Sequence, residues 1–306
     1  MKGRTDDKHG LGDWVIDPVR FPRGLGYIAD KVHEAGLMFG LWVEPEMVNP
    51  DSDLYRAHPD WCLHIPGRDR TEERNQLILD LSRAEVQDYI VQAVSSILES
   101  TKIDYVKWDM NRNMTEAFSA VQDPEGQFET QHRYMLGLYS VLEKIVTRFP
   151  EILFESCSGG GGRFDAGMLY YMPQTWTSDD TDAVQRLGIQ YGTSFAYPAS
   201  AMGAHVSAVP NHQTGRITSM KLRGDVALEL GLHLGVVGVQ VAEHGVGGGG
   251  RRGEPDVVAG EEPRERAGGG VEDPVDGVEV HRGQRGAVLG TGQGRVLEHL
   301  GRQFGA

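Results

Sequence analysis

The clearest chemistry in the sequence is carried by residues 107–112, which read KWDMNR. Asp109 follows residues 103–108, IDYVKW, which we interpret as a β-strand. A carboxylate at the end of such a strand can act as a nucleophile or as an acid–base group. Lys107 shares the strand face of Asp109, so we expect its ammonium to keep that carboxylate ionised. The ordinary alternative is an aspartate that caps the next helix, and the residue types favour the chemical role.

A second group of carboxylates lies at residues 178–182, which read SDDTD. By residue type alone, a catalytic carboxylate and a helix N-cap are equally good interpretations, because Ser-Asp-Asp before a helix is also a common N-cap run. Glycoside hydrolysis, however, needs two carboxylates on opposite sides of one bond. One attacks the anomeric carbon, and the other protonates the leaving oxygen and later activates water. Asp109 and a member of this run would form such a pair.

Residues 157–163, CSGGGGR, form a glycine-rich segment. Its backbone N–H groups could approach a ligand closely, and Gly159 is our candidate for that contact. The segment lacks the Lys-Ser/Thr of a phosphate loop, so we do not expect a nucleotide site. A flexible turn is the simpler alternative. Cys157 has no histidine near it in the sequence, which argues against a thiol nucleophile.

Short apolar runs alternate with amphipathic helical patterns over the first 225 residues. Gly36 ends a predicted helix over residues 25–32, and Ser82 with Glu85 has the spacing of a capping box that opens a helix. Strands are predicted over residues 37–43, 77–81, 103–108 and 152–154, and a helix over 134–148. This order predicts a parallel sheet covered by helices. We favour a TIM (β/α)8 barrel over an open sheet because no phosphate-binding glycine pattern opens the first helix.

The polar residues just past these strand ends should form the site. They are carboxylates interleaved with tryptophans: Trp42, Glu44, Asp80, Lys107, Trp108, Asp109, Glu155, Cys157, Trp176 and Asp179. Carboxylates perform acid–base and nucleophilic steps, and a flat indole face packs on the C–H side of a sugar ring. The strand ends therefore indicate a carbohydrate site.

The composition narrows the classes of binding partner, the location and the cofactors that we expect. The chain has 306 residues and a formal charge of -14, which argues against nucleic acid or an anionic membrane. No apolar run approaches the ~20 residues of a membrane span, and residues 1–10 lack a signal-peptide core, so we expect a cytoplasmic protein. Two cysteines, Cys62 and Cys157, provide no disulfide framework. The eleven histidines show no zinc-like spacing, so no metal is expected.

The chain changes character near residue 225. All its Trp and Tyr residues precede residue 198, and glycine clusters occupy residues 247–250 and 268–270. We therefore divide it into a partial catalytic barrel, residues 1–225, and a Gly/Arg-rich tail, residues 226–306. A segment so poor in aromatic residues buries little apolar area. Disorder is one interpretation of the tail, and a shifted reading frame in a GC-rich gene is the other.

Taken together, these motifs resemble glycoside hydrolase family 36, the microbial α-galactosidases. They are residues 12–14 (GDW), 40–47 (GLWVEPEM), 53–55 (DLY), 107–111 (KWDMN), 155–165 (ESCSGGGGRFD) and 174–182 (QTWTSDDTD). The resemblance implies a retaining mechanism on terminal α-linked galactose, with small oligosaccharides as substrates and no metal or organic cofactor.

The resemblance also assigns roles to residues. Asp109 matches the nucleophile and Asp179 the acid/base, with Asp182 as the second choice. Sugar-binding positions are matched by Trp42, Arg74, Lys107, Asn111 and Cys157. To these we add Trp108, Gly159 and Trp176 from their places at the strand ends and in the glycine-rich segment.

The sequence departs from the family at both ends. We expect a preceding β-sandwich domain, the first barrel strand with its paired acids, and the last strand to be missing, with Met1 as an internal start. Weak or absent activity of the chain alone follows, because an incomplete barrel has open edges. The alternatives are an inactive or carbohydrate-binding remnant, the same chemistry on α-N-acetylgalactosamine and, more distantly, a metal-dependent amidohydrolase. The sequence does not decide whether the chain forms a homo-oligomer.

Overall fold

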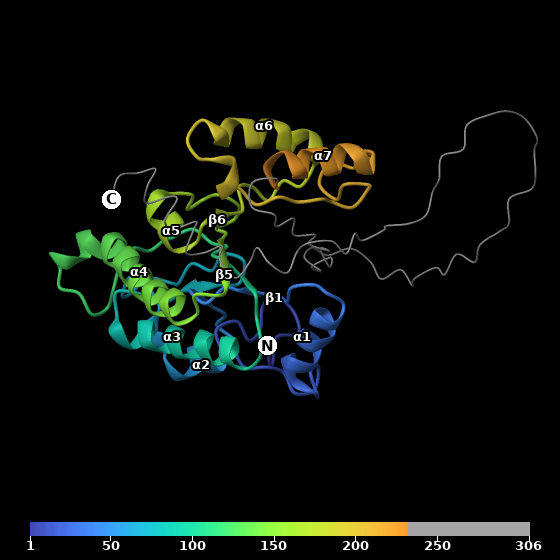
Figure 1. Ribbon diagram of the computed structural model, residues 1–306. Coiled ribbons are helices and arrows are strands. Elements are labelled where there is room, and N and C mark those ends of the chain that lie inside the picture. Colours follow the sequence, from blue (N-terminus) through green and yellow to red (C-terminus); the bar gives the residue numbers. More distant parts are fainter. Residues whose placement is uncertain (232–306) are drawn as a thin grey trace, which may run out of the picture.

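The computed structural model describes residues 1–231 (Figure 1). Almost all of the predicted tail, residues 226–306, lies outside the described residues, so its disorder or altered frame stays a prediction. Helix α7, Met220–Gly231, crosses the boundary predicted at residue 225.

Four parallel strands form the main sheet in the order β1-β4-β5-β6. They are β1, Gly40–Val43; β4, Tyr105–Trp108; β5, Leu153–Ser156; and β6, Gln174–Thr175. Helices α3, Ala84–Glu99, α4, Thr130–Arg148, and α5, Ala166–Tyr171, connect successive strands. This is the repeated strand–helix–strand unit that the alternation predicted. Within residues 1–231 the sheet stays open between β1 and β6.

The remaining elements surround this sheet. They are α1, Gly24–Glu34; β2, Met47–Val48; α2, Asp53–Ala57; β3, Leu77–Ile78; α6, Ala183–Ser194; and short 3-10 helices at Pro59–Trp61, Gly126–Glu129 and Ala199–Ala201. Helices α6 and α7 pack together at one end of the molecule, away from the α3–α4 pair (Figure 1).

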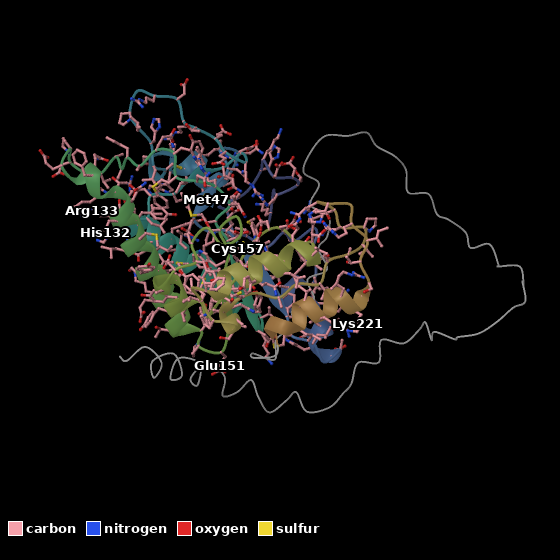
Figure 2. The ribbon with its side chains drawn as sticks, turned by 90° about the horizontal axis from the view of Figure 1, so that it is seen from above. Met47, His132, Arg133, Glu151, Cys157 and Lys221 are labelled. Atoms are coloured by element: carbon pink, nitrogen blue, oxygen red, sulfur yellow. The ribbon has the colours of Figure 1, made fainter. Side chains whose placement is uncertain are left out.

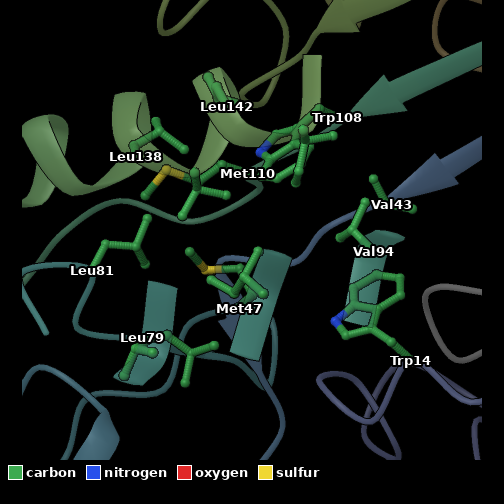
Figure 3. Close-up of a cluster of buried hydrophobic side chains, with 14 of the residues drawn as sticks. Trp14, Val43, Met47, Leu79, Leu81, Val94, Trp108, Met110, Leu138 and Leu142 are labelled. Atoms are coloured by element: carbon green, nitrogen blue, oxygen red, sulfur yellow. The ribbon is translucent and has the colours of Figure 1, made fainter. Parts of the chain in front are cut away.

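The apolar core lies between the sheet and helices α3 and α4. Val86, Ile90 and Val94 of α3 are buried at helical spacing, whereas Ile97 is only half-buried. On α4 the buried positions include Leu138 and Leu142. Figure 3 shows this packing, with Trp108 and Met110 near Leu142, and Met47 above Leu79. The sequence predicted α4 with a start four residues too late.

Two local predictions were wrong. Residues 77–81 do not join the parallel sheet, because Leu77 and Ile78 pair antiparallel with β2. Ser82 does not cap α3, which begins at Ala84 and has Arg83 as its N-cap without a side-chain hydrogen bond. The Ser82 hydroxyl instead donates to Asp80 Oδ1 at 2.6 Å, and Glu85 accepts from Arg83 at 2.8 Å.

Strand alternation sorts the side chains of the sheet into two faces. Val106 and Phe154 point toward the helices and are fully buried in the core. The opposite face carries a polar row, because the strand register places Trp42 beside Lys107, Lys107 beside Glu155, and Glu155 beside Gln174. Asp109 and Cys157 stand two residues further along their strands on this same face.

Candidate active site

The polar row forms the floor of the site. Lys107 Nζ lies 3.1 Å from Glu155 Oε1, and the Tyr105 hydroxyl donates to Glu155 Oε2. The ammonium of Lys107 is therefore paired with Glu155. We expected it to act as the neighbour that keeps Asp109 ionised, but its ion pair is with this other carboxylate, which the register brings directly opposite.

Asp109 is held instead by N–H donors. Its Oδ2 accepts from Trp42 Nε1 at 2.9 Å and from Asn111 Nδ2 at 2.6 Å, and its Oδ1 accepts from the Met110 N–H at 2.9 Å. The Asp109 N–H donates to the Val43 carbonyl at 2.8 Å, which ties the residue to β1. Only 5% of Asp109 is exposed. These three donors hold the buried carboxylate in one orientation.

Glu44 is a site residue that the sequence placed at a strand end without giving it a role. It is buried, and it accepts from the Asn111 N–H at 2.8 Å and from Gln76 Nε2 at 3.0 Å. Burial and, next, the charge of Asp109 raise the pKa of Glu44 to about 7. Its position two residues after Trp42, on the same strand face, was the signal that could have identified it.

Cys157 lies against Asp109 from β5. The Met110 N–H donates to its carbonyl at 3.1 Å, and its thiol lies close enough to the Asp109 carboxylate to feel its charge. Burial and the nearby charge of Asp109 raise the pKa of this thiol, so it stays protonated and is no nucleophile. Both Cys62 and Cys157 are free thiols. Figure 2 shows Cys157 and Met47 inside the molecule, whereas Glu151 and Lys221 lie at its edge.

Asp179 follows β6 and is exposed. Its Oδ1 accepts from Trp176 Nε1 at 3.1 Å, and its carbonyl accepts from Gln213 Nε2 at 2.9 Å. Trp176 is only 5% exposed, and the Lys107 ammonium and the Arg186 guanidinium each lie 4.4 Å from its ring centroid. We expected Trp176 to contact the sugar. Its covered ring leaves it to position Asp179.

The glycine-rich segment packs against the backbone that carries Asp179. A Cβ at Gly160, whose φ is +86°, would lie 2.9 Å from the Ser178 Cα, and one at Gly161 would lie 2.8 Å from the Thr177 carbonyl oxygen. Glycines are thus required for this close approach. A Cβ at Gly159 would meet open space, so its expected contact with the ligand stays a prediction.

Two further candidates, Asp182 and Trp108, occupy positions in which they support the fold. Asp182, the second choice for the acid/base, is the N-cap of α6, accepts from Thr214 Oγ1 at 2.5 Å and pairs with Arg216 Nε at 2.8 Å. The hydrogen bond from Thr214 is the main reason that the pKa of Asp182 falls to about 2. An acid that is ionised to such low pH cannot supply a proton near neutrality.

Trp108 was expected to contact substrate and does not line the site. It is completely buried among the core residues, and its Nε1 donates to Glu46 Oε1 at 2.8 Å. Strand alternation explains the error, because Trp108 faces the helices while Lys107 and Asp109 face the other side.

Trp42, Asn111 and Cys157 do gather around Asp109, as expected. The indole of Trp42 is 40% exposed beside the carboxylate. Arg74 is an exposed residue with a φ of 54°, close enough to Glu44 to lower its pKa. Within residues 1–231, no three His, Cys, Asp or Glu side chains are grouped so that they could hold a metal ion. Over the same residues, no helix has the length and hydropathy of a membrane span.

Comparison with known proteins identifies the family. The family model described as Melibiase matches residues 1–244. The chain belongs to the melibiase family. It is 67% identical over 225 residues to alpha-galactosidase AgaA of Geobacillus stearothermophilus, a match covering 74% of this chain and 31% of that protein. A Lactobacillus acidophilus alpha-galactosidase is 54% identical over 233 residues, covering 76% of this chain and 32% of that protein.

Comparison with solved structures supports the same family. The chain matches the crystal structure of AgaA, a family 36 enzyme, with a TM-score of 0.72 over 74% of this chain and 31% of that one. The family 36 resemblance and the barrel fold are thereby confirmed, although the sheet of residues 1–231 does not close. The chain spans about a third of the length of the curated relatives that it matches.

Proposed function

We propose that this melibiase chain carries the catalytic centre of a retaining α-galactosidase, which removes terminal α-linked galactose from small oligosaccharides. The observation that carries the proposal is the buried Asp109 carboxylate, fixed by three N–H donors beside the partly exposed indole of Trp42. A nucleophilic carboxylate must be held in place before it attacks, and these donors fix its position.

The mechanism follows from two carboxylates in different surroundings. Asp109 attacks the anomeric carbon and forms a galactosyl ester, while Asp179 protonates the departing glycosidic oxygen. Asp179 is exposed, so water can then reach it, lose a proton to it and hydrolyse the ester. Two inversions at one carbon give net retention. Trp42, Arg74, Lys107, Asn111, Cys157 and Gly159 are the proposed sugar-binding residues.

Relatives support both the substrate and the pair of carboxylates. Crystal structures of AgaA variants contain raffinose and stachyose. The raffinose complex carries an aspartate-to-asparagine substitution and the stachyose complex an aspartate-to-alanine substitution. The two substituted aspartates lie as many residues apart as Asp109 and Asp179 do in this chain. A cytoplasmic location and a homo-oligomeric state stay predictions for fractionation and light scattering.

Hydrolysis of p-nitrophenyl α-galactoside by the purified chain tests the proposal. We expect activity, weak for an open barrel, that disappears in Asp109→Asn and persists in Asp88→Asn. Asp88 is a matched control because it lies exposed on α3, where it pairs with the equally exposed Lys144. Activity that survives in Asp109→Asn would contradict the role of Asp109. A folded chain without any activity would favour the alternative, a non-catalytic remnant.

A further inference from the structure

The buried carboxyl of Glu44 has no step in the mechanism above, yet it touches the residue that holds the nucleophile. Glu44 Oε1 accepts the Asn111 N–H at 2.8 Å, and the Asn111 side chain donates to Asp109 Oδ2 at 2.6 Å. Asn111 is thus fixed at its backbone by one carboxyl group and fixes a second with its amide. Glu44 Oε2 is occupied by Gln76, whose Nε2 lies 3.0 Å away.

We propose that Glu44 is a positioning residue for Asp109: it anchors Asn111, and its charge state sets the field in which the nucleophile works. The inference deepens the proposed function and rests on it where catalysis is concerned. Glu44 itself does not contact the reacting atoms; it acts through Asn111 and through its charge.

The charged groups around Glu44 come from three parts of the chain. Asp109 faces it from the end of β4, Arg74 from the turn between β2 and β3, and Arg4 from the segment before α1. Within residues 1–231 no cation lies at ion-pair distance from Glu44, so the two arginines act only from further away. Burial and the charge of Asp109 outweigh them and raise the pKa of Glu44 to about 7. Glu44 therefore changes charge near neutral pH.

Gln76 allows the site to hold Glu44 in either charge state. Gln76 is buried, and its Oε1 has no hydrogen-bond partner. Half a turn of its amide would exchange nitrogen and oxygen, so that Oε1 could accept the proton of a neutral Glu44. A donor for the carboxylate and an acceptor for the carboxylic acid are thus available from one side chain.

Carboxyl and amide NMR of the full chain tests the proposal without any need for activity. The chain is labelled with ¹³C at Asp and Glu carboxyls and with ¹⁵N, and the Glu44 signal is assigned by its loss in Glu44→Gln. We expect Glu44 to titrate near pH 7, and the Asn111 amide to shift with the same midpoint in the wild type but not in Glu44→Gln. In Asp109→Asn the midpoint of Glu44 should fall, because the like charge is gone. A Glu44 midpoint near that of a free glutamate, or an unresponsive Asn111 amide, would overturn the proposal.

Kinetics adds a second test, using p-nitrophenyl α-galactoside. Glu44→Ala should lower kcat about 10²-fold, the scale of a small misplacement of a reacting group, with little change in KM. Glu44→Gln keeps an acceptor for Asn111 and should recover most of that loss, while its pH profile lacks the Glu44 transition. A Glu44→Ala variant that raises only KM would contradict a positioning role. Because the NMR titration reports on Glu44 even in an inactive chain, failure of the proposed activity and failure of this inference are distinguishable.

Discussion

The carboxylates of this site differ in their burial and in the donors that surround them. Asp109 is buried and receives three N–H donors, whereas Glu44 is buried beside it and has no ion-pair partner among residues 1–231. Asp179 is exposed with one indole donor, and Asp182 is tied to a helix N-terminus, a threonine and an arginine. Environments that differ in this way fit the separate roles that we propose for these carboxylates, which no residue pattern distinguishes.

Asp179 and Asp182 should behave differently when each is changed to Asn. Asp179→Asn removes the proposed proton donor, so hydrolysis of melibiose should fall by about 10²-fold or more, the usual contribution of a general acid. Hydrolysis of p-nitrophenyl α-galactoside should fall less, since its leaving group needs little protonation. Asp182→Asn should lower the urea midpoint and leave kcat of the folded protein near the wild-type value. Equal kinetic losses in both variants would contradict the assignment.

Glu44 should make the stability of the chain depend on pH. Its pKa rises from 4.5 in the unfolded chain to about 7 in the folded one, so the folded state keeps a proton that the unfolded state has lost. The stabilisation that this proton gives the folded state is therefore complete below pH 4.5, is lost as the pH rises toward 7, and does not change further above that pH. In the free energy of unfolding, the total change is of the order of 3 kcal/mol. Urea unfolding between pH 4.5 and 8 should show this slope in the wild type and a smaller one in Glu44→Gln. An identical slope in the two proteins would show that Glu44 titrates normally.

At the scale of elements, the glycine-rich segment joins the two halves of the site. It leaves β5 beside Asp109 and packs on the backbone after β6 that carries Asp179. The sequence indicated only that this backbone could approach something closely. What it approaches is a second strand end, and that partner depends on how β5 and β6 pair.

Alanine at Gly160 and at Gly159 separates close packing from backbone strain. Both glycines have positive φ, so either substitution strains the backbone, but only a Cβ at Gly160 would clash, at 2.9 Å from the Ser178 Cα. We expect Gly160→Ala to lower kcat/KM by about 10²-fold through displacement of Asp179. Gly159→Ala keeps the backbone N–H proposed to contact the sugar and places its Cβ in open space, so it should lower mainly stability, by about 1 kcal/mol. Steady-state kinetics and urea unfolding of the two variants provide the comparison. A smaller kinetic loss at Gly160 than at Gly159 would contradict this role of the loop.

The sequence predicted those features of the fold and the site that depend on neighbouring residues, and it missed those that depend on contacts between distant segments. Apolar runs ending in Glu44, Asp109 and Glu155 identified the three longest strands and the edge on which the site lies. The sequence could not show that Lys107 pairs with Glu155, because that contact depends on strand register. Nor could it show that Trp108 faces the core, since a tryptophan beside a catalytic aspartate fits a sugar site equally well.

For the whole molecule, one buried carboxylate ties the site to the core. Glu46 accepts both guanidinium N–H groups of Arg163 at 2.9 Å, the Tyr134 hydroxyl at 2.6 Å and the Trp108 indole at 2.8 Å. These donors come from the glycine-rich segment, helix α4 and strand β4. The cluster therefore fixes the segment that supports Asp179 to the helix layer.

Removing the cation of this cluster should destabilise the entire fold. Arg163→Met leaves the Glu46 carboxylate buried without its ion-pair partner, at a cost of about 3–5 kcal/mol. The matched control is Lys144→Met, which breaks the exposed pair with Asp88 and should cost no more than about 1 kcal/mol. Urea unfolding measures both variants. Equal, small losses would show that the Glu46 cluster is not central to stability.

The most direct test of the account is to trap the covalent intermediate. A fluorinated galactosyl fluoride reacts with a retaining enzyme but releases the sugar slowly, so the galactosyl ester accumulates even when turnover is weak. We predict that mass spectrometry of the digested chain will find one added sugar, on the peptide that contains Asp109, and none in Asp109→Asn. A sugar on any other residue, or a folded chain that stays unlabelled, would contradict the assignment of Asp109 as the nucleophile.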